Sequence, residues 1–226
     1  MVLAIVKKEL RETGLFAVLA VAMYLIYLSR LTGTWGRSLT SPFGWVPGLN
    51  VEVPDVPFVH GNFLSVLVYI GFVLAIALGF RQSAWEPSQG TALYLLHLPL
   101  ARRTIYLTKL ATGIGILLLC TLLPILIYGV WAASPRTHAG PFEWSMTGPA
   151  FQIWSILPLA YLGAFASGIR PARWIGSRLL PLLSVAIPAV YSYAIPHWWL
   201  FAFPVLVVVA ATLVSGILWV VATRDF

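Results

Sequence analysis

Six long apolar runs constrain the fold of this chain more than any other feature. A transmembrane helix needs roughly 20 apolar residues, and six runs approach this length without a charge in the middle of any of them. They cover residues 15–31, 62–80, 110–133, 151–168, 179–195 and 200–221. Hydrophobic residues make up 60% of the chain and its mean hydropathy is +0.89, well above the balance of soluble domains. We therefore expect an all-α integral membrane protein with six spans in one domain, residues 1–226.

The basic residues predict the orientation of these spans. Lys and Arg near the ends of spans are retained on the cytoplasmic side, and six spans place both termini on one side. Eleven of the 14 basic residues fall on that side and three on the other, where Arg30, Arg37 and Arg136 lie. We therefore predict a multi-pass protein of the inner (cytoplasmic or plasma) membrane with both termini cytoplasmic. The net charge of +7 is explained by this retention and by anionic headgroups, so we expect no nucleic-acid partner.

The first 14 residues predict a short amphipathic helix at the membrane interface. Leu3, Val6 and Leu10 recur at helical spacing among charged residues. A frayed charged leader fits this segment equally well. Glu9 and Glu12 interrupt the basic leader that a signal peptide requires, so we expect the first span to be retained.

The predicted loops alternate between the two sides. Residues 32–61 and 134–150 form external loops, and residues 169–178 form a cytoplasmic loop. The first external loop is rich in aromatic residues, which favours an anchoring belt at the headgroups over a role in substrate capture. Its aromatic residues include Trp35, Phe43, Trp45 and Phe58.

Small residues recur every fourth position in two of the spans. Such stripes allow helix backbones to approach closely, and they comprise Gly71, Ala75 and Gly79 in one span and Ala160, Ala164 and Gly168 in the other. Prolines at positions 124, 158, 181, 188 and 204 predict kinks or breaks. The fifth and sixth spans are joined only by residues 196–199, which fits either a tight hairpin or a pair of partial, re-entrant helices. Cys120 is the only cysteine, so no internal disulfide can form.

The segment 81–109 is the most informative part of the chain. Pro87 suits the first turn of a helix, Glu86 complements the positive helix end, and Pro99 disfavours helical geometry at the preceding residue. These signals predict a short cytoplasmic helix between the second and third spans. A second helix then carries Arg102 and Arg103 through the headgroup layer and enters the membrane after Lys109. We also expect Lys7, Lys8 and Arg11 to lie at this interface.

The residues of this segment resemble the ABC-2 type permease pattern, E-x-x-x-G-T, a leucine-rich turn, P-x-x-R and K-L. Here the pattern reads EPSQGTALYLLHLPLARRTIYLTKL. The N-terminal interface helix, the six spans and the short basic C-terminus agree with it, although specific residues match over only about 25 positions. The very short connection before the sixth span departs from the small external helices that many such permeases carry.

The resemblance implies a permease subunit of an ATP-driven ABC exporter, with the segment from Glu86 to Leu98 as its coupling helix. That helix would dock against an ABC ATP-binding subunit, and the residues implied in coupling are Glu86, Gly90, Thr91, Leu95 and Pro99. This chain has no G-x-x-x-x-G-K-[ST] phosphate loop, so we expect no cofactor in it, and ATP and magnesium in the partner subunit. By resemblance the translocation path lies between two permeases, either two copies of this chain or this chain and a related permease.

Two other classes of function remain open. An integral membrane enzyme acting on a lipid-like substrate would need ionisable groups gathered at the membrane, and the four histidines and seven acidic residues form no catalytic or metal-binding motif. We therefore expect a non-catalytic chain without a metal site. A membrane anchor or immunity protein that transports nothing differs only by lacking the coupling segment. The apolar spans favour a lipid-like, peptide or drug-like cargo.

Overall fold

The computed structural model describes residues 2–33, 56–59, 62–88, 101–170, 174–195 and 197–223, and within these all regular structure is helical. Its elements are α1 (Val2–Leu31), α2 (Phe63–Ser88), α4 (Arg102–Ala133), the short 3-10 helix η1 (Trp144–Thr147), α5 (Gly148–Ile169), α6 (Ile175–Ser184), α7 (Ala186–Ala194) and α8 (Trp198–Thr223). In these ranges six helical segments are long and apolar enough to cross a membrane, α6 and α7 together forming one of them. The all-helical, six-span expectation is confirmed at this level.

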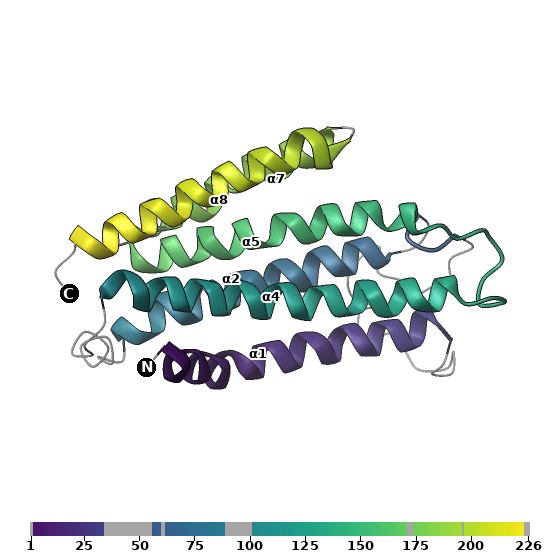
Figure 1. Ribbon diagram of the computed structural model, residues 1–226, viewed down its shortest axis with the longest axis horizontal. Coiled ribbons are helices and arrows are strands. Elements are labelled where there is room, and N and C mark those ends of the chain that lie inside the picture. Colours follow the sequence, from purple (N-terminus) through teal and green to yellow (C-terminus); the bar gives the residue numbers. More distant parts are fainter. Residues whose placement is uncertain are drawn as a thin grey trace.

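The helices lie side by side in one bundle, with both ends of the chain at the same end of it (Figure 1). We call this the N/C end. Helices α1, α2, α4 and α5 form the main group, and α7 and α8 lie along one side of it (Figure 1). Helix α5 is central, because 72% of its most apolar stretch is buried compared with 17% for α8.

Helix α1 runs without a break through the predicted boundary at residue 14. The apolar stripe expected to define an interface helix points outward, since Leu3 is 81% and Leu10 is 49% exposed. The buried face of these turns instead carries Ile5, Glu9 and Thr13, spaced four residues apart. The outward surface of these turns carries Lys7 and Arg11 beside Leu3 and Leu10, a mixture of cations and apolar groups that suits the headgroup boundary of a membrane.

Around the segment 81–109, one helix boundary differs from the prediction and one agrees with it. Helix α2 continues past residue 80 to Ser88, so Glu86 and Pro87 belong to its last turn rather than to the start of a separate helix. Helix α4 begins at Arg102, so Arg102 and Arg103 lie in its first turn, as expected of the second helix of this segment. Both helices are longer than the hydrocarbon core, which is about 30 Å thick. The 26 residues of α2 span about 39 Å and the 32 residues of α4 about 48 Å.

The two predicted small-residue stripes face each other between α2 and α5. A Cβ added to Gly79 would lie 2.7 Å from Ala164 Cβ and from Tyr161 O, and one at Gly168 would overlap the Ser83 side chain. At the next turns along α2, Ala75 is fully buried and Gly71 contacts Leu157. The expectation of a close packing face is therefore confirmed.

The fifth predicted span is divided at Val185, between α6 and α7. Two prolines, Pro181 in α6 and Pro188 in α7, flank the break. Val185 is buried against Gly163 of α5, where an added Cβ would lie 2.8 Å from the valine Cγ2. In contrast, α4 and α5 continue through Pro124 and Pro158 without ending.

Phe58 in the first external loop is buried among other aromatic residues rather than exposed on the surface of the bundle. Its ring centroid lies 4.6 Å from that of Tyr128 and 5.3 Å from that of Phe63, and only 2% of the residue is exposed. The other three aromatic residues predicted for the anchoring belt lie outside the described residues. Aromatic packing of this kind ties the end of the loop to α2 and α4.

Candidate functional site

Four polar side chains meet inside the bundle, toward the N/C end. They come from four different helices and are Glu9 of α1, Gln82 of α2, Lys109 of α4 and Tyr161 of α5. Each is at most 3% exposed. We call this group the polar cluster.

The cluster is built around the carboxylate of Glu9. Lys109 Nζ lies 3.6 Å from Glu9 Oε1, and the Gln82 side-chain amide donates a hydrogen bond of 2.8 Å to Glu9 Oε2. The Tyr161 hydroxyl in turn donates to Gln82 Oε1 at 2.5 Å. The carboxylate therefore receives a hydrogen bond from α2 and the charge of a cation from α4.

The charge of Glu9 determines the orientation of the glutamine amide. If the amide were turned over, its oxygen would face the carboxylate and its NH₂ would face the tyrosine hydroxyl. An ionised carboxylate accepts hydrogen bonds and repels a carbonyl oxygen, so the observed orientation is the favourable one. The hydrogen bonds thus run in one direction, with Tyr161 donating to Gln82 and Gln82 donating to Glu9.

Gly113 provides the space that this arrangement needs. It lies one helical turn after Lys109 on α4, and a Cβ there would overlap both Gln82 Oε1 and the Tyr161 hydroxyl. No side chain larger than hydrogen fits without displacing the cluster. Thr13 completes the surroundings by donating from its hydroxyl to the Glu9 carbonyl oxygen at 2.6 Å.

The structure corrects the role expected of Lys109. It was expected to reach lipid headgroups, but it is 1% exposed and paired with an equally buried carboxylate. Arg102 and Arg103, one and a half to two turns earlier on α4, are exposed. The physical reason is register, since the face of α4 that carries Ile105, Lys109, Gly113 and Leu117 is turned to the other helices.

The remaining predicted interface residues lie on the surface of α1. Lys7 and Arg11 are exposed, and Lys8 is partly exposed and 3.6 Å from Glu12 one turn later. Their positions are compatible with a headgroup layer at the N/C end. Membrane lipids are thus the surroundings that these residues are expected to meet.

Most of the predicted coupling residues fall outside the described part of the chain. These are Gly90, Thr91, Leu95 and Pro99. Glu86 lies in the last turn of α2, and its side chain also falls outside the description. The structure describes the two helices that flank this segment. Helix α2 leads into it and helix α4 leads out of it, and the polar cluster connects these two helices.

A second polar contact, close to the N/C end, stabilises the end of α5. Arg178 of α6 lies with its guanidinium nitrogens 3.4 Å from the carbonyl oxygens of Ser167 and Gly168. These carbonyls belong to the last turn of α5, where no later helical N–H is present to bond them. The negative end of the helix dipole also stabilises a cation at this position.

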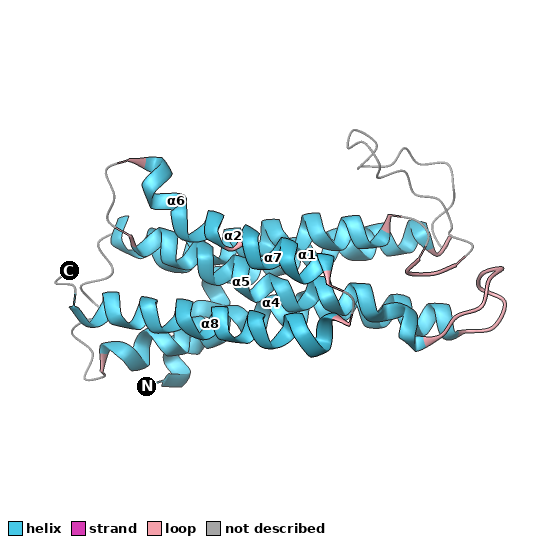
Figure 2. Cartoon of the chain, turned by 90° about the horizontal axis from the view of Figure 1, so that it is seen from above, coloured by secondary structure: helices cyan, strands magenta, loops and turns pink. Residues whose placement is uncertain are grey.

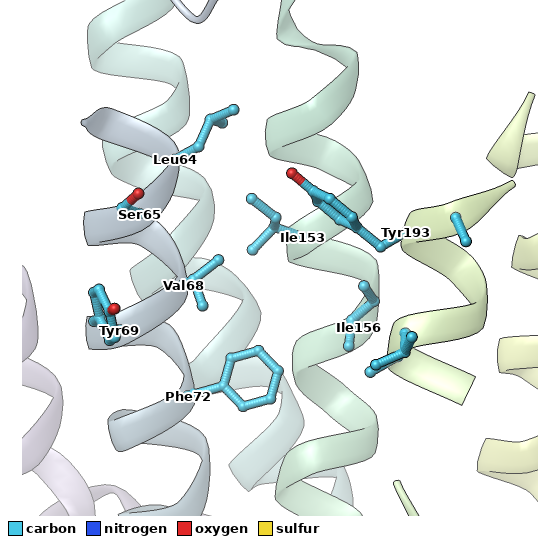
Figure 3. A pocket seen from close by; sticks show the side chains of 11 residues that line it. Leu64, Ser65, Val68, Tyr69, Phe72, Ile153, Ile156 and Tyr193 are labelled. Carbon is cyan, nitrogen blue, oxygen red and sulfur yellow. The ribbon is translucent and has the colours of Figure 1, made fainter. Parts of the chain in front are cut away.

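An apolar groove lies on the opposite half of the bundle, between α2, α5 and α7. Its volume is about 510 Å³, and Figure 3 shows Leu64, Val68 and Phe72 on one side and Ile153 and Ile156 on the other. Tyr193 extends from α7 toward α2 across it (Figure 3). No lining residue carries a charge, so the groove suits an apolar occupant.

In the part of the chain that the structure describes, no three His, Cys, Asp or Glu side chains gather in a way that could hold a metal ion. Glu9 and Lys109 were not singled out together by the sequence reasoning. The sequence does contain one indication of their burial. Each lies in a row of residues four positions apart on one helix face, and the other residues of that row are buried. Comparisons of the chain with protein-family models, with curated proteins and with solved structures find no match.

Proposed function

We propose that this chain is the permease subunit of an ATP-driven exporter of the ABC-2 type, coupled through the segment after Glu86 to a separate ATP-binding subunit. The observation that carries the proposal is the polar cluster. It joins α2, which enters the coupling segment, to α4, which leaves it, through the Glu9 carboxylate of α1. A force applied to the segment would then reach three helices together.

The position of the cluster along the helices supports this role. Lys109 lies seven residues after the first residue of α4, and Gln82 lies six residues before the last residue of α2. At a rise of about 1.5 Å per residue, both contacts lie roughly 10 Å from the helix ends. The two helices are therefore held together close to the proposed docking segment.

The tight contact between α2 and α5 supports transmission toward the other end. Gly79 and Gly168 allow the two backbones to touch, so movement of α2 must be accompanied by movement of α5. The apolar groove beside these helices fits the lipid-like, peptide or drug-like cargo favoured by the spans. The exposed faces of α6, α7 and α8 leave room for a second permease, and Figure 2 shows α8 running along the outer side of the bundle.

The proposed orientation places the N/C end in the cytoplasm. Figure 2 shows both termini at that end of the bundle. The described basic residues at this end are Lys7, Lys8, Arg11, Arg81, Arg102, Arg103, Lys109, Arg170 and Arg178, whereas Arg30 and Arg136 lie toward the opposite end. This asymmetry agrees with positive-inside retention.

The experiment is affinity purification of the tagged chain in mild detergent, followed by mass spectrometry of co-purifying proteins. A variant with Glu86 and Gly90 both replaced by bulky apolar residues is compared with the native chain. The control variant is Ser145→Ala, an exposed change on η1 at the opposite end of the bundle.

We expect an ATPase with a Walker phosphate loop to be recovered with the native chain and the control, and to be lost with the Glu86 and Gly90 variant. ATP hydrolysis by the recovered complex should likewise fall in that variant while membrane insertion is unchanged. Recovery of no ATPase in several mild detergents would contradict the proposal and favour a membrane enzyme or a passive anchor.

A further inference from the structure

A second groove lies between α5, α6 and α8 at the N/C end, away from the polar cluster. It encloses about 320 Å³, and its wall is mostly apolar, with Arg170 and Thr212 as its charged and hydroxyl-bearing residues. The apolar wall includes Ala166, Ile169, Leu213, Ile217 and Val220. The charged residue at the groove is Arg170, which immediately follows the last residue of α5.

Arg170 is exposed, and among the described residues no carboxylate forms an ion pair with it. The helix end beside it already has a cation, because Arg178 contacts the last carbonyl oxygens of α5. The part of the chain that the structure describes therefore leaves the positive charge of Arg170 open to a ligand. Trp219, which is 69% exposed, lies on the same groove and is a residue type that favours the membrane interface.

The shape of the groove matches one class of molecule. Its residues on α8 run from Thr212 to Val220, a length of about 12 Å along the helix axis. Among the described lining residues the cation is Arg170, at the N/C end of the groove, and mostly apolar side chains continue from it along α8 as far as Thr212. A ligand that fits must therefore be an anion at one end and a hydrocarbon along the rest.

We propose that this groove binds an anionic phospholipid of the leaflet at the N/C end, with the phosphate on Arg170 and one acyl chain along α8 between α5 and α6. A guanidinium binds phosphate by paired hydrogen bonds, and its positive charge favours an anionic headgroup over a zwitterionic one, in which a choline cation offsets the phosphate charge. The apolar wall holds the chain. The site needs only the membrane and does not depend on a partner ATPase.

Gly216 offers a way to fill the groove without disturbing the fold. It lies on the groove wall, and a Cβ added there meets no atom within 4 Å. Gly115 of α4 has equally open surroundings and does not line the groove. Gly216→Leu and Gly115→Leu are therefore a matched pair that adds the same side chain inside and outside the site.

The test is native mass spectrometry of the purified full chain with phosphatidylglycerol or phosphatidylcholine of identical acyl chains. We compare Arg170→Gln and Gly216→Leu with the controls Arg136→Gln, an exposed arginine toward the opposite end of the bundle, and Gly115→Leu. The native chain should bind phosphatidylglycerol more tightly, and Arg170→Gln should remove about a fivefold preference, the contribution of roughly one basic residue at a membrane surface. Gly216→Leu should weaken binding of both lipids, and both controls should behave as the native chain does.

Equal binding of the two lipids by the native chain would overturn the proposal, as would the same loss of preference in Arg136→Gln as in Arg170→Gln. The mass of the protein in detergent is measured for each variant by light scattering. If Gly216→Leu converts a dimer to a monomer without changing lipid binding, the groove is instead a contact between copies of this chain, which also overturns the proposal.

Discussion

The ammonium of Lys109 lies 3.6 Å from the carboxylate of Glu9, and both side chains are 1% exposed. Helices α1 and α4 thus share an ion pair that neither water nor a headgroup reaches. Taking two charges out of water is costly, and the attraction between them offsets that cost only while both are present. The stability of the bundle should therefore be sensitive to the loss of either charge.

Removing one member of this pair should destabilise the protein strongly. In Glu9→Gln the buried lysine loses the charge of Glu9, and in Lys109→Met the buried carboxylate loses the charge of the lysine. We expect each to lower the free energy of unfolding by about 3–5 kcal/mol. The double variant should lie near the native protein, since the amide oxygen introduced by Glu9→Gln still accepts the hydrogen bond from Gln82.

Thermal unfolding in one detergent, followed by intrinsic tryptophan fluorescence, measures these effects. The control is Glu12→Gln, which breaks the Lys8–Glu12 pair of the same 3.6 Å separation but with side chains about a third exposed. Exposed pairs contribute about 0–1 kcal/mol, so this variant should unfold close to the native temperature. Equal losses in Glu9→Gln and Glu12→Gln would show that burial of the pair does not matter.

Gly113 and Gly115 should respond in opposite ways to the same substitution. A Cβ on Gly113 would overlap Gln82 Oε1 and the Tyr161 hydroxyl, whereas one on Gly115 meets nothing within 4 Å. Gly113→Ala should lower the free energy of unfolding by about 1–3 kcal/mol, the usual cost of overpacking. Gly115→Ala should be neutral or stabilising by up to about 1 kcal/mol, because alanine favours the helix.

The free energy of unfolding of the two variants is compared directly, and Gly115→Ala serves as the control because the two glycines lie two residues apart on the same helix. An unchanged midpoint for Gly113→Ala would mean that the cluster can move aside, and would argue against the rigid connection of α2, α4 and α5 on which the proposed coupling depends.

The spans and the small-residue stripes were predictable from sequence, but the polar cluster was not. Span length depends on local hydropathy, and the stripes on a four-residue period within one helix. The pairing of Glu9 with Lys109 depends on which helices are neighbours and on how each is rotated, and tertiary packing decides both. Lys109 follows Arg102 and Arg103 in a basic segment, so local context predicted a headgroup contact for it. Likewise, Phe58 stands in a loop of interfacial composition, and only the fold shows that it is buried.

The contact of α2 with α5 should not tolerate even one added methyl group at Gly79. The atoms nearest to that position include Tyr161 O and Phe165 N at 2.7 and 2.9 Å, and backbone atoms cannot rotate away as a side chain does. Gly79→Ala must therefore separate the helices and should lower the unfolding temperature. Gly14→Ala on α1, where an added Cβ meets nothing within 4 Å, is the control. A native unfolding temperature for Gly79→Ala would show that the two helices are less closely packed than described.

The two ends of α4 should lie on opposite sides of the membrane. Ala101 precedes its first residue and Ser134 follows its last, and both are exposed. The 32 residues between them span about 48 Å, more than the roughly 30 Å hydrocarbon core. Cys120 is replaced by serine, and cysteine is then introduced separately at position 101 or 134. An impermeant maleimide should label position 134 in intact cells and position 101 only after the membrane is opened, because positive-inside retention places the N/C end in the cytoplasm. Labelling of both positions from one side would show that α4 does not cross the membrane, and the reverse pattern would show that the bundle crosses it in the opposite orientation.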